Sequence, residues 1–326
     1  MTTERDHGGD LAAATRAFGG APADWIDLST GINRVPWPVP PVSPHAWTAL
    51  PGREARDRLI AAARCAYGTD WPILPLGGAQ AAIQLLPALA PDGAVRIVTP
   101  TYNEYAGVLA LSGRVVEGVP EAAALAGAGM AILVNPNNPD GRRVSASDLR
   151  GIASCVGLLV VDESFADPHP ELSLLTGACP ENVIVLRSFG KFYGLAGLRL
   201  GFALGARAHL DRIAAMAGPW SVSGPALEIG AAALCDADWR AVSTARLGND
   251  AVRADKLARD AGWNCLGGTA LFRLYETPDS TAARAQLGRA RIWSRVFPWS
   301  PRALRLGLPG SSWEWARLGE ALAREA

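Results

Sequence analysis

A lysine stands by itself in a segment of small residues that follows an apolar run. Lys191 lies within LRSFGKFYGLAGLRLGF, between a serine and a later arginine. An amine attacks an aldehyde to form a Schiff base only when it is deprotonated, so a lysine with this task must occupy a pocket that lowers its affinity for protons. The chain has two lysines, and Lys256 is the other candidate. The alternative is an ordinary surface lysine in a loop.

A carboxylate ends the apolar run LLVVDE. This run predicts a buried strand that delivers Asp162 into a cleft, where an anion needs a cation beside it. The protonated nitrogen of a pyridine ring would supply that cation. Glu163 would point the other way, because neighbouring residues of a strand alternate between its faces. A helix cap or a surface salt bridge is the alternative for Asp162.

Two glycines separate an expected strand from an expected helix in PLGGAQAAIQLL. The backbone amides of Gly78, Ala79 and Gln80 could turn towards an anion such as a phosphate. Ser188 and Arg199 would add a hydroxyl and a guanidinium, the latter suited to bidentate phosphate contacts. A plain turn and ordinary surface groups are the alternatives.

Three further side chains have types that could contact a ring or a carboxylate. Asn138, in NPNNPDG, could donate its amide to a ring oxygen, although asparagine is also common in turns. Tyr102 could lay its ring over a pyridine or pack in the core. Arg305, in ALRLGLPG, could clamp a carboxylate or be an exposed strand residue.

The elements that must position these residues are short apolar runs bounded by turn residues, which are typical of buried strands. They span residues 73–76, 95–99, 131–135, 158–162, 183–187 and 200–204. Stretches of helical length at 79–90 and 146–155 lie between some of them, and this alternation predicts a mainly parallel sheet covered by helices. Ligands of such sheets bind beyond the carboxyl ends of the strands, where the polar motifs stand.

The domain organisation expected from these patterns has three parts. Residues 1–39 would form an amino-terminal arm that contributes to the small domain and the site, because GINRVPWPVPPVSP is too rich in proline for regular structure. Residues 40–215 would form the large domain and 216–326 a small one, with strands at 270–276, 292–297 and 303–308 and a final helix from 312.

Composition argues against nucleic-acid-binding, membrane and disulfide-rich proteins. The 326 residues carry 31 basic and 31 acidic side chains, so no net charge attracts the chain to nucleic acid or to a membrane surface. Five cysteines without a CxxC pair predict neither a disulfide framework nor a metal site. No apolar run reaches the roughly 18 residues of a membrane helix, and MTTERDHGGD lacks the apolar core of a signal peptide. We expect an unprocessed cytoplasmic protein whose partners are small molecules.

Motifs in the middle of the chain resemble those of fold-type I pyridoxal-phosphate enzymes: NPNNP, VVDES and SFGKFYGLAGLRLG. The opening DHGGDL, followed by WIDLSTGIN, resembles the threonine-phosphate decarboxylase branch of cobalamin biosynthesis, which is close to histidinol-phosphate aminotransferases. The resemblance implies an α/β fold, with a mainly parallel seven-stranded sheet in the large domain and a small α+β domain at the carboxyl end. It also implies pyridoxal 5'-phosphate as the cofactor and a homodimer.

The resemblance implies a role for each of the motif residues that would hold the cofactor: Gly78, Ala79, Tyr102, Asn138, Asp162, Ser188, Lys191 and Arg199. Lys191 would carry it as a Schiff base, Asp162 would meet its ring nitrogen and Asn138 its ring oxygen. Tyr102 would stack on the ring, and the remaining four would hold the phosphate. Lys191, Asp162 and Tyr102 would be the catalytic residues.

The resemblance also implies a set of residues that would bind a phosphorylated amino acid: His7, Gly31, Asn33, Asn138, Arg295 and Arg305. His7, on an arm that folds over the substrate, and Arg295 would meet its phosphate, with Arg302 as a competitor for the second role. Arg305 would bind the carboxylate, and Gly31 and Asn33 would lie near it.

The chain departs from the relatives at two positions. Phe165 stands where many aminotransferases have a tyrosine, which removes a hydrogen-bond donor to the ring oxygen of the cofactor. Leu50 stands where sister enzymes offer a tyrosine to the cofactor phosphate of the neighbouring subunit. The intersubunit phosphate contact is therefore not expected, whereas dimerisation is.

The expected reaction is the decarboxylation of O-phospho-L-threonine to (R)-1-amino-2-propanol O-2-phosphate. The chain would then be a lyase. The alternative is an aminotransferase of the histidinol-phosphate type, because the same cofactor-binding residues serve both reactions. A non-catalytic regulator with this fold is a third hypothesis, but such a protein would lack the lysine or the aspartate, and both are present.

Overall fold

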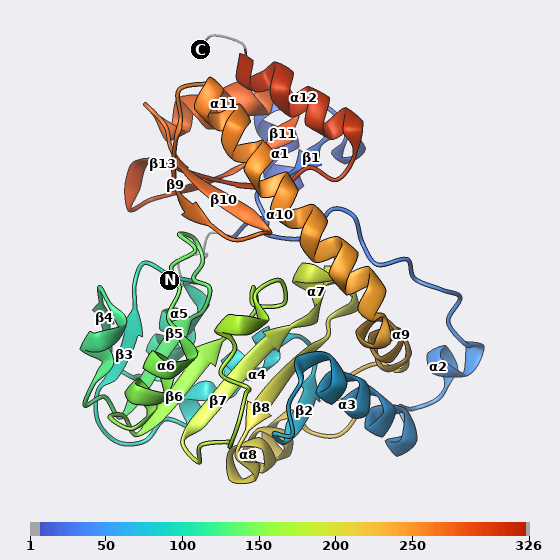
Figure 1. Ribbon diagram of the computed structural model, residues 1–326, viewed down its shortest axis with the longest axis vertical. Helices are drawn as coiled ribbons and strands as arrows, with labels where there is room; N and C mark the ends of the chain where they lie inside the picture. Colours follow the sequence, from blue (N-terminus) through green and yellow to red (C-terminus); the bar gives the residue numbers. More distant parts are fainter. Residues whose placement is uncertain (1–6, 324–326) are drawn as a thin grey trace. The chain divides into compact units, whose positions relative to one another are not determined.

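The computed structural model describes residues 7–323, and these residues form two compact units. The larger unit comprises Trp37–Asn138 and Arg142–Arg240. The smaller unit comprises the described residues up to Pro36, the short segment Pro139–Gly141, and the chain from Ala241 onwards. Both units are drawn in Figure 1.

The larger unit is built on a seven-stranded sheet in the order β2-β8-β7-β6-β5-β3-β4. Its strands are β2 (Ile73–Leu76), β3 (Val95–Val98), β4 (Val116–Val119), β5 (Met130–Val134), β6 (Leu158–Asp162), β7 (Val183–Ser188) and β8 (Gly201–Gly205). Strand β8 runs antiparallel to both of its neighbours, and the other pairs are parallel. The predicted mainly parallel sheet of an α/β fold is therefore confirmed.

The central strands consist of continuous apolar runs because both faces of the sheet are covered. Every residue of β5, β6 and β8 is buried, as expected for strands with helices on either side. The parallel register pairs Val134 with Asp162 and Asp162 with Leu186, so the carboxyl ends of β5, β6 and β7 lie at one edge of the sheet. This edge is where the polar motifs begin.

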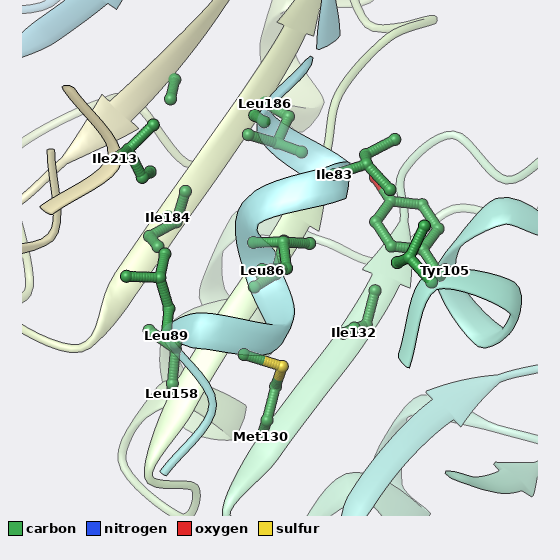
Figure 2. Close-up of a cluster of buried hydrophobic side chains, with 14 of the residues drawn as sticks. Ile83, Leu86, Leu89, Tyr105, Met130, Ile132, Leu158, Ile184, Leu186 and Ile213 are labelled. Carbon is green, nitrogen blue, oxygen red and sulfur yellow. The ribbon is translucent and has the colours of Figure 1, made fainter. Parts of the chain in front are cut away.

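Among the described residues, eight α-helices lie wholly within the larger unit: α2 (Pro44–Thr48), α3 (Arg53–Tyr67), α4 (Ala79–Leu85), α5 (Glu104–Leu111), α6 (Ala146–Ala153), α7 (Phe189–Phe192), α8 (Arg207–Ala217) and α9 (Gly224–Cys235). Helix α9 packs on α3. Side chains of α4 and α5 face those of β5, β6 and β7 in the core (Figure 2). The predicted helix 79–90 is α4 followed by a 3-10 turn at Leu86–Ala88, where Pro87 lacks an amide donor.

The predicted domain boundary at 215 differs from the division that the structure shows. Residues 216–240 belong to the larger unit, because α9 packs against α3. A Cβ atom on Gly230 of α9 would lie 3.0 Å from the side chain of Leu59, and this proximity shows how closely the two helices approach. The sequence signal for α9 is a plain apolar helix, which does not indicate the unit that it covers.

The smaller unit contains a four-stranded antiparallel sheet in the order β12-β13-β10-β9. Its strands are β9 (Asn264–Gly268), β10 (Phe272–Glu276), β12 (Arg295–Phe297) and β13 (Ser300–Gly307). A separate parallel pair joins β1 (Ile26–Asp27) to β11 (Ile292–Trp293). Helices α1 (Leu11–Phe18), α11 (Ser280–Arg289) and α12 (Ser312–Ala323) belong to this unit, and α10 (Ala237–Asp260) enters it at Ala241.

The prediction of one strand at 292–297 was wrong. Residues Ile292 and Trp293 pair with β1, whereas Arg295–Phe297 pair with β13, so the chain changes partner at Ser294. Among the described residues, no helix combines the length and the apolar composition needed to cross a membrane.

Candidate active site

A cavity in the larger unit lies where the strands β5, β6 and β7 end. The residues that line it include polar side chains, two aromatic rings and the backbone of a glycine turn: Gly78, Ala79, Gln80, Tyr102, Asn138, Asp162, Ser164, Phe165, Ser188, Lys191 and Arg199. All eight residues predicted to hold a cofactor are among them. The structure thus brings together residues from six separate segments of the sequence.

Asp162 is the last residue of β6 and is 3% exposed. The backbone amide of Ser164 donates to its Oδ1 at 2.9 Å, and the hydroxyl of Tyr105 donates to its Oδ2 at 2.7 Å. Burial raises the pKa of Asp162, while the hydrogen bonds from Ser164 and Tyr105 and the charge of Lys191 oppose that rise. A cation bound in this cavity would therefore be stabilised by a carboxylate that has little contact with water.

Lys191 lies in α7, the single helical turn that follows β7. Its Nζ is 5.8 Å from the centroid of the Phe165 ring. A Cβ atom on the preceding Gly190 would approach Cα of Ala196 to 2.6 Å, so a larger residue cannot stand there without moving the turn. The other lysine, Lys256, has a 70% exposed side chain and pairs with Asp260 at 2.5 Å. Of the two lysines, Lys191 is the one that lines the cavity.

The turn between β2 and α4 forms a backbone cradle beside Arg199. Gly78 has a φ of +88°, which favours glycine, and a Cβ atom at this position would lie 2.9 Å from Nη2 of Arg199. A Cβ atom on Gly201 would collide with the backbone nitrogen of Ala79. The two glycines therefore keep space beside the backbone amides and the guanidinium, which is the arrangement that an oxyanion such as phosphate requires.

Tyr102 and Asn138 line the same cavity from the ends of β3 and β5. The hydroxyl of Tyr102 donates to Oε1 of Gln80 at 3.2 Å, and Nε2 of Gln80 donates to Glu104 at 2.8 Å. The Tyr102 ring meets the Tyr105 ring edge to face, with centroids 6.2 Å apart. These contacts orient the ring of Tyr102 without occupying its whole surface.

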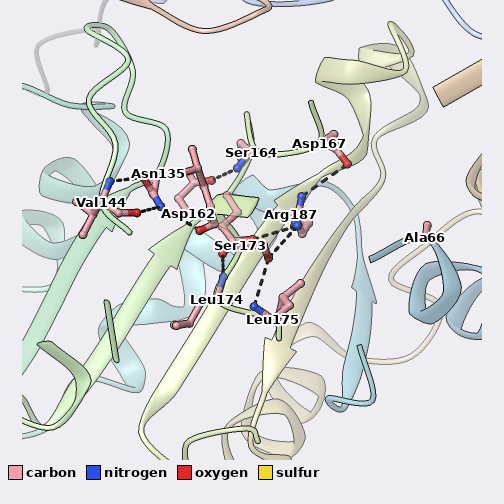
Figure 3. A network of polar contacts seen from close by, with 12 residues as sticks. Ala66, Asn135, Val144, Asp162, Ser164, Asp167, Ser173, Leu174, Leu175 and Arg187 are labelled. Atoms are coloured by element: carbon pink, nitrogen blue, oxygen red, sulfur yellow. Dashed lines mark hydrogen bonds and ion pairs between the residues drawn. The ribbon is translucent and has the colours of Figure 1, made fainter. Parts of the chain in front are cut away.

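A buried polar network lies next to Asp162 but does not line the cavity (Figure 3). Glu163 accepts hydrogen bonds from the hydroxyl of Ser173 and the amide of Leu174, both at 2.7 Å. The guanidinium of Arg187 lies 3.1 Å from Glu163 and 3.7 Å from Asp167. Burial raises the pKa of Asp167 to about 6. This network ties the ends of β6 and β7 to the loop that follows β6.

The residues predicted to bind substrate, apart from Asn138, lie in the smaller unit. His7 and Arg295 line one cavity there, together with Ser29, Arg284 and Ser294. Arg302 does not line it: its Nε donates to the carbonyl of Thr277, and its Nη1 is 3.4 Å from Glu276. The structure therefore places Arg295, rather than Arg302, beside His7.

The other predicted substrate residues are buried. Arg305 is 4% exposed, and its Nη2 donates to the carbonyl of Ser29 at 2.6 Å. Asn33 is 3% exposed, and its Oδ1 accepts a hydrogen bond from Arg246 at 2.6 Å. Gly31, two residues before Asn33, is also buried. In the sheet, Arg305 stands opposite Arg295.

Sequence reasoning missed the roles of Tyr105, Ser164 and Arg284. Tyr105 follows Tyr102 by three residues, and the helical spacing of two tyrosines after an expected strand is a signal that could have found it. Ser164 contacts Asp162 through its backbone amide, which its residue type does not reveal. Arg284 lies on an ordinary helix, α11, so no local pattern marks it.

Comparison with known proteins agrees with the geometry. The profile of the family described as aminotransferase class I and II matches residues 54–310. A threonine-phosphate decarboxylase of Sinorhizobium sp is 45% identical over 98% of this chain and 97% of its own length. A threonine-phosphate decarboxylase of Pseudomonas aeruginosa is 42% identical over 97% of each chain.

Among solved structures, histidinol-phosphate aminotransferase from Sinorhizobium meliloti in complex with pyridoxal-5'-phosphate has a TM-score of 0.81 at 21% identity. That alignment covers 95% of this chain and 93% of the solved one, and it shows the fold. With a family profile over most of its length and two close relatives over nearly all of it, the chain belongs to the family of class I and II aminotransferases.

Proposed function

We propose that this protein is a pyridoxal-phosphate-dependent lyase that decarboxylates O-phospho-L-threonine to (R)-1-amino-2-propanol O-2-phosphate. The observation that carries the proposal is the cavity in which the amine of Lys191 and the buried carboxylate of Asp162 lie beside the backbone cradle at Gly78. Two relatives that align with almost the whole chain bear the name threonine-phosphate decarboxylase. The product belongs to the linker of the cobalamin nucleotide loop.

The residues of the cavity suit the chemical groups of pyridoxal 5'-phosphate. Lys191 would hold the aldehyde carbon of the cofactor, and Asp162 would pair with its ring nitrogen. Asn138 would donate to the ring oxygen, and Tyr102 would cover the ring. Arg199, Ser188 and the amides of Gly78 and Ala79 would bind the phosphate. The bound cofactor supplies an electron-withdrawing ring for the pair of electrons left on the reacting carbon.

The protein's part in the reaction is to orient the substrate and to move one proton. Arg305 would hold the substrate carboxylate, near Gly31 and Asn33, and His7 and Arg295 would hold its phosphate. Fixing both anionic groups determines which bond of the reacting carbon can break most easily. The bond to the carboxylate carbon would break and carbon dioxide would leave. The protonated amine of Lys191 would then donate to the same carbon the proton that replaces the carboxylate, and Lys191 would regain a proton from solvent.

Transamination of histidinol phosphate has weaker support. The solved histidinol-phosphate aminotransferase from Sinorhizobium meliloti is 21% identical to this chain and therefore indicates the fold alone. The relatives at 45% and 42% identity, which align with nearly the whole chain, carry the decarboxylase name.

The test is to incubate the cofactor-loaded protein with O-phospho-L-threonine, without any keto acid, and to measure carbon dioxide and the amino alcohol phosphate. We expect the wild type and Lys256→Ala each to release one carbon dioxide for each amino alcohol phosphate formed. Lys191→Ala should form neither product. A coloured wild-type protein that releases no carbon dioxide, but transfers the amino group when a keto acid is added, would reverse the choice between the two reactions.

We also propose that the protein is a cytoplasmic homodimer. The larger unit exposes apolar side chains that are usually buried, Trp47 at 69%, Leu50 at 68% and Trp220 at 59%. Aromatic side chains are enriched at protein–protein interfaces relative to the rest of a protein's surface. Sedimentation analysis tests the oligomeric state: we expect the mass of two chains, and Trp220→Glu should shift the mass towards that of one chain.

Cell fractionation tests the location, and we expect the protein in the cytoplasmic fraction.

A further inference from the structure

A cavity in the smaller unit has more positive than negative charge. Arg284, Arg295 and His7 line it, and Asp10 is the carboxylate among the lining residues. Asp10 is engaged locally, because its Oδ1 accepts from the amide of Ala13 at 2.8 Å as the cap of α1. The charges therefore favour an anionic ligand over a cationic one.

Ser294 lines this cavity with a buried hydroxyl that has no hydrogen-bond partner among the described residues. The residue is 1% exposed. A buried hydroxyl without a partner is unfavourable and rare, and it requires an explanation. The other serine in the cavity, Ser29, differs, because it donates to Asp27 at 2.6 Å and accepts from the amide of Gly9 at 2.8 Å. An oxygen atom of a bound ligand would give Ser294 the partner that the chain does not.

Arg284 is held in a fixed orientation by an aromatic cluster. Its guanidinium carbon lies 3.9 Å from the centroid of the Trp293 ring. Trp293 is itself buried and packs edge to face against Trp25, with centroids 6.1 Å apart, and against Phe18. A stacked guanidinium loses little additional freedom when it binds an oxyanion with two parallel hydrogen bonds.

Two strand pairings position Ser294 in this cavity. Strand β11 ends at Trp293, where it pairs with β1, and β12 begins at Arg295, where it pairs with β13. Ser294 is the residue between the two pairings, and its neighbours on either side both line the cavity. Three consecutive residues thus supply a stacking surface for Arg284, a hydroxyl and a guanidinium.

We propose that Arg284 and Ser294 bind the phosphate group of the substrate together with His7 and Arg295, and thereby determine the preference for a phosphorylated over an unphosphorylated amino acid. This inference rests on the proposed function for the identity of the ligand. A tetrahedral phosphate has enough oxygen atoms to accept hydrogen bonds from both guanidinium groups and from the hydroxyl.

The first experiment measures the binding of inorganic phosphate by calorimetry to the cofactor-loaded protein, in which the cofactor's own phosphate fills the other anion site. We expect Arg284→Gln to weaken binding about tenfold and Ser294→Ala about threefold, in line with the loss of a charge-assisted and of a neutral hydrogen bond. Arg289→Gln is the matched control, because Arg289 lies on the same helix, is exposed and does not line the cavity. Arg284→Lys, which keeps the charge, covers the case in which Arg284→Gln fails to fold.

The second experiment measures kcat and KM with O-phospho-L-threonine and with L-threonine. The KM for the phosphorylated substrate should rise by factors similar to those for phosphate binding, with kcat/KM for L-threonine unchanged. Phosphate binding equal to the wild type in both variants, or weakened as much by Arg289→Gln, would overturn the inference. If the wild type does not act on O-phospho-L-threonine but the variants still weaken phosphate binding, the anion site stands and the proposed function fails.

Discussion

The hydroxyl of Tyr105 donates a 2.7 Å hydrogen bond to Asp162, and both residues are buried in the larger unit. Removing this donor in Tyr105→Phe leaves the carboxylate with less support for its charge, so its pKa should rise further. A hydrogen bond to a charged group contributes about 1.5–3 kcal/mol, and the affinity for pyridoxal 5'-phosphate should fall about tenfold or more. Titration of the apoprotein with cofactor, followed by fluorescence, measures this.

Tyr275→Phe is the control for that variant. Tyr275 donates to Asp255 at 3.0 Å in the smaller unit, so its removal also deletes a tyrosine–aspartate hydrogen bond. It should lower the melting temperature without changing the affinity for the cofactor. Equal affinity in Tyr105→Phe and the wild type would show that the bond does not support Asp162.

Gly78→Ala should reduce the affinity for the cofactor. The added Cβ would lie 2.9 Å from Nη2 of Arg199, and the φ of +88° is unfavourable for alanine. Gly113→Ala is a matched control, since Gly113 has a φ of +78° but nothing within 4 Å of the added atom. Both variants should lose about 1 kcal/mol of stability, and Gly78→Ala alone should need a higher cofactor concentration for saturation. A parallel loss of affinity in both would attribute the effect to backbone strain.

The ion pair of Arg187 with Glu163 should matter far more than one at the surface. Arg187→Met leaves the buried Glu163 and the largely buried Asp167 without their cation, which should cost about 3–5 kcal/mol of the free energy of unfolding. Arg58→Met breaks a pair with Glu54 in which both side chains are more than half exposed, and its cost should be below about 1 kcal/mol. Urea titrations of the two variants give the comparison, and similar costs would contradict the structural distinction.

Asp167 should make stability fall as the pH rises. Burial raises the pKa of Asp167 from its ordinary value of 3.8, which applies to the unfolded chain, to about 6 in the folded protein. Between these two values the folded state binds more protons than the unfolded state. The wild type should therefore lose up to about 3 kcal/mol relative to Asp167→Asn between pH 4 and pH 6. The measurement is the difference in unfolding free energy between the two proteins across that range; a difference that is constant with pH would contradict the assignment.

Much of the larger unit could be predicted because its strands are continuous apolar runs. Asp162 and Lys191 follow two such runs, and their neighbourhood in the cavity results from the parallel register of β6 and β7. Strand β4 was not predicted, because it is an edge strand whose residues Glu117 and Gly118 are exposed. A strand with one buried residue carries no apolar signal.

The smaller unit was harder to predict because its contacts join distant parts of the chain. Strand β1 pairs with β11 across more than 260 residues, so nothing near Ser294 in the sequence shows where the chain changes partner. The stacking of Arg284 on Trp293 depends on that pairing. Local patterns report how a segment is buried, and they do not report which segment covers it.

The scarcity of lysine has a consequence for chemical selectivity. A reactive aldehyde condenses with any accessible amine, and most proteins display many such amines on their surface. Here the remaining cationic side chains are arginines, and the second lysine, Lys256, is tied to Asp260 on an exposed helix. Reduction with borohydride followed by mass spectrometry should therefore find labelled lysine side chains at no more than two positions, Lys191 inside the cavity and Lys256 outside it.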